Sequence, residues 1–128
     1  MIVLDACVLI ASADRSDEHH NAAATILATP EALAISALTR AEVLVDPPRA
    51  TTAAWQQVLH DLGVKVLPLA EADMVALAGV RRRTRLKMPD AIVVYLAQRE
   101  RAGLASFDAR LLEAAAGLGL PIHAVDAR

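Results

Sequence analysis

Short apolar runs and helix-forming stretches alternate along the 128-residue chain, and this alternation limits the folds available to it. A short continuous apolar run is typical of a strand that is buried on both faces. We expect five such strands, over residues 2–4, 33–35, 64–67, 103–105 and 122–125. Helices are expected between them, over residues 7–13, 18–28, 37–45, 49–62, 71–85, 89–101 and 108–116. The pattern predicts an α/β fold in which helices cover both faces of a parallel sheet.

Composition supports this architecture and excludes some functions. Hydrophobic residues make up 55% of the chain but aromatic residues only 2%, so the core must be built from Ala, Leu and Val. With only Trp55, Tyr95 and Phe107 as large rings, the chain cannot offer an extended surface for stacked bases. A formal net charge of −2 argues against DNA binding by bulk electrostatics. The single cysteine, Cys7, excludes an internal disulfide framework and fits a reducing compartment.

The first apolar run does not have the features of a signal peptide. No basic region precedes it, and Asp5 interrupts it. The longest apolar stretch, around residues 91–97, is too short to span a bilayer. We therefore expect one domain over residues 1–128, with no membrane contact and a cytoplasmic location.

Acidic residues stand at the ends of predicted strands or the starts of predicted helices. Asp5 comes directly after the first strand, and Asp108 follows the fourth strand after Ser106 and Phe107; ligands of open parallel sheets bind at that carboxyl edge. Asp90 lies in the first turn of its helix, where the helix dipole stabilises a negative charge. Asp5 and Asp108 can equally serve as helix N-caps. For Asp5, Asp90 and Asp108 alike, a structural role and a functional role therefore both remain open.

Glu42 gives a stronger indication of a site. Leu38 and Val45 lie at i−4 and i+3 from it, so we expect Glu42 on the buried stripe of a helix that Ser36 caps. Arg40 is two residues away and faces elsewhere, so it is not a local partner. An unpaired carboxylate on a buried stripe is costly, which favours a ligand that compensates its charge.

Four carboxylates near one edge of the sheet would repel one another, and a cation would relieve this repulsion. The four are Asp5, Glu42, Asp90 and Asp108. No His or Cys lies at ligand spacing with them, which disfavours zinc. Ligation by oxygen alone is the preference of Mg²⁺ or Mn²⁺, and these ions commonly act on phosphates.

The order of these acids and the strings around them resemble the PIN-domain nucleases, most closely the VapC toxins of toxin–antitoxin pairs. The matching strings are MIVLDACVLI, SALTRAEV, MPDAIVVYLA and LASFDARL. The resemblance spans essentially the whole chain. It implies strand order 3-2-1-4-5, a homodimer and a small antitoxin that blocks the active site.

The resemblance also implies a Mg²⁺- or Mn²⁺-dependent ribonuclease. The metal would be carried by Asp5, Glu42, Asp90 and Asp108. A metal-bound water would then attack the RNA phosphodiester in line and leave 5′-phosphate and 3′-hydroxyl ends.

The chain departs from the family pattern after the first acid. Ala6 stands where many relatives carry Thr or Ser, and Cys7 stands where a small polar residue is common. We interpret Cys7 as a small packing residue. Ser106 matches a hydroxyl often found two residues before the fourth acid. It could support that carboxylate or a metal-bound water, or it could simply be a polar residue at a strand end.

Five basic residues gather just before the loop that carries Asp90. They are Arg81, Arg82, Arg83, Arg85 and Lys87. An inward helical stripe is expected to consist of Ala70, Met74, Leu77 and Ala78. Continued along the helix, it reaches Arg81 and Arg85, which we expect to emerge where the stripe leaves the core. We predict RNA phosphate contacts for Arg81, Arg82, Arg85 and Lys87. A solvated helix end, whose cations suit the dipole, is the alternative.

The remaining rings carry less information. His19 and His20 precede a helix and are expected on a solvated face. Trp55 lies on an amphipathic helix and is either a core residue or an anchor for the antitoxin or a second protomer.

Two other functions compete with a ribonuclease. A haloacid-dehalogenase-like phosphatase also has an Asp after its first strand, but Cys7 stands where that class requires a second Asp. The other alternative is a catalytically silent PIN-like module that binds RNA or protein. The intact set of four acids argues against a silent module.

Overall fold

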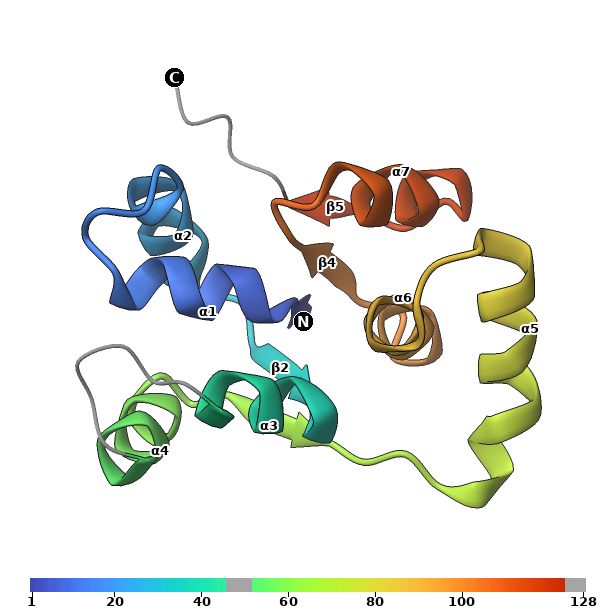
Figure 1. Ribbon diagram of the computed structural model, residues 1–128, viewed down its shortest axis with the longest axis horizontal. Helices are drawn as coiled ribbons and strands as arrows, with labels where there is room; N and C mark the ends of the chain where they lie inside the picture. Colours follow the sequence, from blue (N-terminus) through green and yellow to red (C-terminus); the bar gives the residue numbers. More distant parts are fainter. Residues whose placement is uncertain (46–51, 124–128) are drawn as a thin grey trace.

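The structure, a computed structural model, describes residues 1–45 and 52–123 (Figure 1). Its strands are β1 (Ile2–Leu4), β2 (Leu33–Ser36), β3 (Lys65–Leu67), β4 (Gly103–Ala105) and β5 (Ile122–His123). They form one parallel sheet in the order β3-β2-β1-β4-β5. This confirms the expected α/β class and strand order. Residues 124–125 of the last expected strand lie outside the described residues.

The helices agree with expectation to within a few residues. They are α1 (Ala6–Ala13), α2 (His20–Leu27), α3 (Ala37–Val45), α4 (Thr52–Asp61), α5 (Met74–Thr84), α6 (Met88–Arg99) and α7 (Ala109–Gly117). The expected helix over residues 71–85 is divided, because a short 3₁₀ helix, η1 (Glu71–Asp73), precedes α5. Residues 49–51 of the fourth expected helix lie outside the described part. Within the two described ranges, no helix is both long and apolar enough to cross a membrane.

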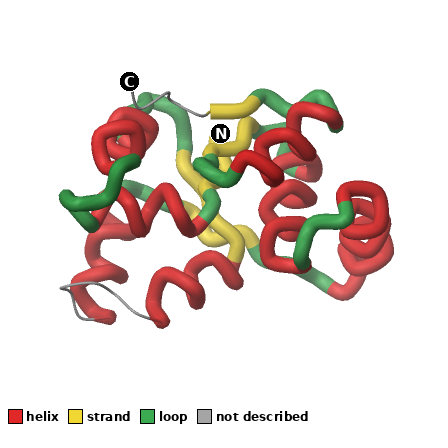
Figure 2. Tube along the Cα trace, turned by 45° about the horizontal axis from the view of Figure 1, so that its top comes forward, coloured by secondary structure: helices red, strands yellow, loops and turns green. Residues whose placement is uncertain are grey.

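The sheet lies between two layers of helices, as the two views in Figures 1 and 2 show. Val3 of β1 packs in a cluster with residues of α5, α6 and α7. Ile2 and Leu4 point to the other face and pack with residues of α1 to α4. Burial on both faces explains why β1 is an uninterrupted apolar run. Trp55 is 2% exposed within the second cluster, which makes it a core residue.

The pairing of β1 with β4 determines which residues meet at the carboxyl edge. Leu4 lies opposite Ala105, and the Asp5 backbone N–H donates to the Ala105 carbonyl oxygen at 2.9 Å. Asp5 and Ser106 therefore leave the sheet from adjacent strand ends. This is the edge at which parallel sheets bind ligands.

The buried face of α5 differs from the expected stripe. Leu77 and Val80 are buried, whereas Met74 is 42% exposed. The helix ends where Arg85 adopts a left-handed conformation, with φ at 59°. Both Arg81 and Arg85 are exposed, which agrees with the expectation that they emerge where the stripe leaves the core.

Ser36 caps α3 as predicted. Its hydroxyl accepts a hydrogen bond from the Thr39 N–H at 2.8 Å and donates to the Thr39 hydroxyl at 3.0 Å. Both side chains are buried.

Ser36→Ala should lower the free energy of unfolding by about 1–2 kcal/mol, because a buried amide loses its acceptor. Urea denaturation measures this loss. Ser16→Ala, at an exposed position, is the control, and an equal loss in both variants would contradict the capping role.

Candidate active site

The four predicted acids come from different elements at one edge of the sheet. Asp5 follows β1 and is the N-cap of α1, whereas Asp108 follows β4 and is the N-cap of α7. Glu42 lies on α3, the helix that follows β2, and Asp90 lies in the first turn of α6. The capping roles of Asp5 and Asp108 are thus real, and they place both carboxylates at the carboxyl edge.

Asp5 is held in place by an unusual number of hydrogen bonds. Its Oδ1 accepts from the Ala6 N–H at 2.8 Å. Its Oδ2 accepts from the Ser106 hydroxyl at 2.8 Å and from the Cys7 thiol at 3.3 Å. Hydrogen-bond donors that follow β1 and β4 therefore converge on one carboxylate. Such donors fix the orientation of a carboxylate that is to act as a ligand.

Ser106 connects two of the acids. Its side chain is fully buried, and its hydroxyl, while donating to Asp5, accepts the Asp108 backbone N–H at 3.0 Å. Ser106 was expected to support the Asp108 carboxylate, but it accepts a hydrogen bond from the Asp108 backbone amide instead. The carboxylate that Ser106 contacts is Asp5.

Cys7 has a role that the sequence did not reveal. Its thiol donates to Asp5, its sulfur accepts the Phe107 N–H at 3.4 Å, and it lies 3.5 Å from the Ser106 hydroxyl oxygen. Burial, and then the charge of Asp5, raise the pKa of the Cys7 thiol to about 11. It therefore remains a protonated donor at neutral pH. The interpretation of Cys7 as only a packing residue was wrong, because its sulfur takes part in the Asp5 network.

The acids affect one another electrostatically. Partial burial of its carboxyl group, followed by the charges of Asp5 and Asp90, raises the pKa of Glu42. The pKa of Asp90 is raised by burial, then by Asp5 and Asp108. The pKa values of Glu42 and Asp90 thus respond to the charges of the other acids, which places the four within electrostatic range of one another.

The reason given for Glu42 from the sequence does not hold. Leu38 is 38% exposed and Val45 81% exposed, whereas Thr39 and Val43 form the buried face of α3. Glu42 is an exposed residue that faces the other acids and does not lie on the buried stripe. The apolar residues beside it were a misleading guide because α3 exposes two of them.

The chemistry of this donor set suits a hard cation. It contains carboxylate oxygens and no imidazole, which is the preference of Mg²⁺ or Mn²⁺. As the side chains lie, no three acidic, His or Cys groups in the described ranges converge closely enough to hold an ion. Glu42 is exposed, so rotation of its side chain could bring its oxygens closer to Asp5 and Asp90.

Two bases accompany the acids. Lys87 and Arg110 both lower the pKa of Asp90, in opposition to the larger effects that raise it. Together with Leu86, Asp90 and Asp108 they line a cavity of about 150 Å³. Lys87 was predicted from the sequence. Arg110 was missed, although its place in the first turn after Asp108 could have indicated it.

The other predicted bases lie farther along the surface. Arg81, Arg82 and Arg85 are exposed and do not line the cavity that holds Asp90 and Asp108. The structure therefore brings Lys87 alone of the predicted bases to the acids. The contacts of the other three with RNA remain predictions.

His19 and His20 are half-buried, so the expectation of a fully solvated position was wrong. The His19 ring stacks on Phe107, next to Asp108, with ring centroids 4.4 Å apart. The His20 Nδ1 lies 2.9 Å from the Ala11 carbonyl oxygen. His19 therefore packs beside the β4–α7 loop without contacting the acids through any hydrogen bond in the described residues.

A protein-family model described as PIN domain matches residues 2–117. The chain belongs to the PIN domain family. The fold and the position of the acids at the carboxyl edge agree with this membership. A search of curated proteins gives no significant match.

Solved structures share the PIN fold. A toxin–antitoxin complex from Klebsiella pneumoniae is 24% identical, with 84% of this chain and 87% of that chain covered and a TM-score of 0.69. FitAcB from Neisseria gonorrhoeae is 18% identical, with 97% of each chain covered and a TM-score of 0.71. VapC20 from Mycobacterium tuberculosis, described as a sarcin–ricin loop cleaving toxin, is 17% identical; 89% of this chain and 95% of that chain are covered, with a TM-score of 0.72.

Repulsion among the four acids should lower the stability of the folded state. Because the pKa of Asp90 is raised, its ionised form is disfavoured in the folded state, and this cost is present at neutral pH and disappears on acidification. Asp90→Asn should raise Tm at pH 7 in EDTA by about 1–4 °C. The gain should shrink towards pH 4, where carboxylates in general become protonated.

Glu71→Gln, an exposed acid on η1, is the matched control in this thermal unfolding experiment. It should leave Tm nearly unchanged at both pH values. An Asp90→Asn protein that is less stable than the wild type at pH 7 would contradict the repulsion.

Proposed function

We propose that the protein is a divalent-metal-dependent endoribonuclease and acts as the toxin of a toxin–antitoxin pair. The observation that carries this proposal is the cluster formed by Asp5, Glu42, Asp90 and Asp108 at the ligand-binding edge, where burial and the neighbouring acids raise the pKa values of Glu42 and Asp90. Membership of the PIN family supports it. So does the fold shared with VapC20, which is described as a toxin that cleaves the sarcin–ricin loop.

The proposed metal is Mg²⁺ or Mn²⁺. When bound, the ion would supply an activated water and neutralise charge on the phosphodiester. Asp5, Glu42, Asp90 and Asp108 would hold it, because their oxygens are the preferred ligands and their repulsion is the cost that a cation removes.

The protein's own side chains would prepare the site for RNA. Ser106 and Cys7 would hold Asp5 in one orientation. Lys87 and Arg110 line the cavity beside Asp90 and would bind the phosphate that is cut. Further phosphate contacts would come from the exposed residues Arg81, Arg82 and Arg85.

We propose that the toxin consists of a single domain and has two partners. These are an antitoxin and a second copy of the chain. The structure of similar fold from Klebsiella pneumoniae is described as a toxin–antitoxin complex, which supports the first. Exposed apolar side chains on α3 and α5, with Val45 81% and Val75 84% exposed, would favour a protein contact on these helices. Light scattering during gel filtration tests the dimer.

A catalytically silent binding module is the second candidate. It is favoured by the absence of three convergent ligand groups in the described part of the chain as the side chains lie. Such a module would bind RNA or protein without cutting, and substitution of Asp90 would hardly change that binding.

Cleavage of total RNA by purified, antitoxin-free protein distinguishes the two candidates. With Mg²⁺ or Mn²⁺ we expect cutting that EDTA abolishes and that Asp90→Asn reduces by about 100-fold or more, because a proposed ligand of the metal is lost. Glu71→Gln should cut like the wild type. Metal-independent cutting, or equal cutting by Asp90→Asn, would refute the metal-dependent mechanism. No cutting by a folded protein that still binds RNA would favour the silent module.

The Asp5 network makes a separate prediction. Cys7→Ala removes one donor to Asp5 and should raise the Mn²⁺ concentration that gives half-maximal cleavage by about 10- to 100-fold. Cys7→Ser restores an O–H donor and should recover most of the metal affinity. A purely structural role for Cys7 predicts a different result. The two variants would then differ in Tm but not in the Mn²⁺ concentration that gives half-maximal cleavage.

A further inference from the structure

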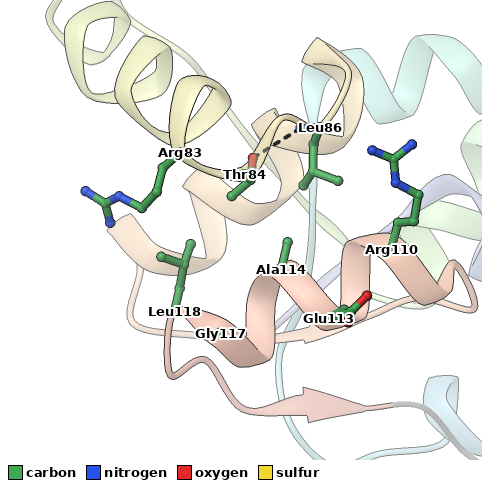
Figure 3. Close-up of a pocket in the computed structure, with 8 residues that line it drawn as sticks. All are labelled: Arg83, Thr84, Leu86, Arg110, Glu113, Ala114, Gly117 and Leu118. Atoms are coloured by element: carbon green, nitrogen blue, oxygen red, sulfur yellow. Dashed lines mark hydrogen bonds between the residues drawn. The ribbon is translucent and has the colours of Figure 1, made fainter.

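A second cavity adjoins the acidic site. It has a volume of about 360 Å³ and lies between the end of α5, the connection to α6, and α7 (Figure 3). Leu86 and Arg110 line both this cavity and the smaller one that holds Asp90 and Asp108. The two cavities are therefore neighbours, and Arg110 stands at their boundary.

The walls of the larger cavity combine apolar and charged groups. Leu86, Ala114 and Leu118 provide apolar surface. Figure 3 shows Arg83 and Arg110 at opposite ends of the cavity, with the apolar side chains between them. In the part of the chain that the structure describes, neither arginine has an ion-pair partner. Their guanidinium groups are thus available to an anionic ligand.

We propose that this cavity binds one nucleotide of single-stranded RNA, adjacent to the phosphate cut at the acid cluster. The inference rests on the proposed ribonuclease function and extends it by giving the strand a path past Arg110. The base packs on Leu86, Ala114 and Leu118. The phosphate of this nucleotide pairs with Arg83, and Arg110 contacts the strand where it leaves the acid cluster.

The chemistry of the walls favours a nucleotide over a simple anion. The volume lies within the roughly 300–1,000 Å³ range of small-ligand sites, larger than a phosphate alone requires. Glu113 also lines the cavity, and its carboxylate repels a phosphate but accepts N–H donors from the edge of a base. The base is therefore placed towards Glu113, at the end of the cavity near Arg110, and the phosphate of this nucleotide towards Arg83 at the other end.

The connection after α5 shapes this cavity. Thr84 donates its hydroxyl to the Val80 carbonyl oxygen and accepts the Leu86 N–H at 3.3 Å. Arg85 turns the chain in a left-handed conformation. These contacts hold Leu86 in place between the two cavities, so the apolar surface exists before a ligand arrives.

The test measures RNA binding separately from cleavage. A fluorescein-labelled, unstructured single-stranded RNA is titrated with Asp90→Asn protein in EDTA, and anisotropy reports the affinity. Ala114→Leu fills the cavity, and Ala116→Leu, at an exposed position of the same helix, is its control. Arg83→Gln removes a charge at the cavity, and Arg15→Gln, in the connection between α1 and α2, is its control.

Ala114→Leu should weaken binding by about tenfold, because the larger side chain fills the space in which the base packs. Arg83→Gln should lower the slope of log affinity against log salt by about 0.7, the value for one lost contact to a single strand. Both controls should bind like the parent protein. Equal affinities for Ala114→Leu and Ala116→Leu, with an unchanged salt slope in Arg83→Gln, would overturn the proposal.

Circular dichroism verifies that each variant is folded. If Ala114→Leu is not folded, the result for Arg83→Gln decides whether the cavity binds RNA. Failure of this proposal leaves RNA cleavage by the wild-type protein intact. Failure of the proposed ribonuclease function would instead appear as absence of cleavage by the wild-type protein with either metal.

Discussion

The parallel pairing of β1 with β4 is the constraint on which the site depends. It places Leu4 opposite Ala105, so the next residues along each strand, Asp5 and Ser106, leave the sheet together. The hydrogen bond between them then joins the two strand ends. A shift of register would separate this pair and reverse the faces of the strand residues. The same pairing thus builds the core and positions the first carboxylate.

The site concentrates negative charge that the fold does not neutralise. Asp5 has three donors, whereas Glu42 and Asp90 have raised pKa values caused by burial and by the other acids. Lys87 and Arg110 offset only part of this effect at Asp90. Residues that reduce stability while sharing a ligand-binding edge are characteristic of functional sites. In our account this unbalanced charge is the driving force for binding a divalent cation.

The strand order came from the resemblance to the PIN-domain nucleases. The positions of β1, β2 and β4 were predicted well because strands that are buried on both faces leave apolar runs that interrupt the helical pattern. Asp5 and Asp108 were placed correctly for the same reason, since each follows such a run. The helical faces were harder. Glu42 was assigned to a buried stripe through Leu38 and Val45, but α3 buries Thr39 and Val43. Apolar periodicity does not identify the buried face when a helix also exposes apolar residues.

Contacts between distant segments were predicted only in part. Cys7 and Ser106 are 99 residues apart, and only the strand order brings the thiol and the hydroxyl to the same carboxylate. Arg110 gave no periodic signal, because its role comes from the approach of α7 to the start of α6. These features depend on tertiary packing, which local patterns do not report.

Calorimetric titration of the RNA-free protein with Mn²⁺ tests whether the acid cluster is a cation site. We predict saturable binding at pH 7 that weakens as the pH falls, because protons compete for Glu42 and Asp90 at a higher pH than for ordinary carboxylates. Glu42→Gln should weaken this binding, and Glu71→Gln should not. Absence of Mn²⁺ binding, or binding that Glu42→Gln leaves unchanged, would contradict the account.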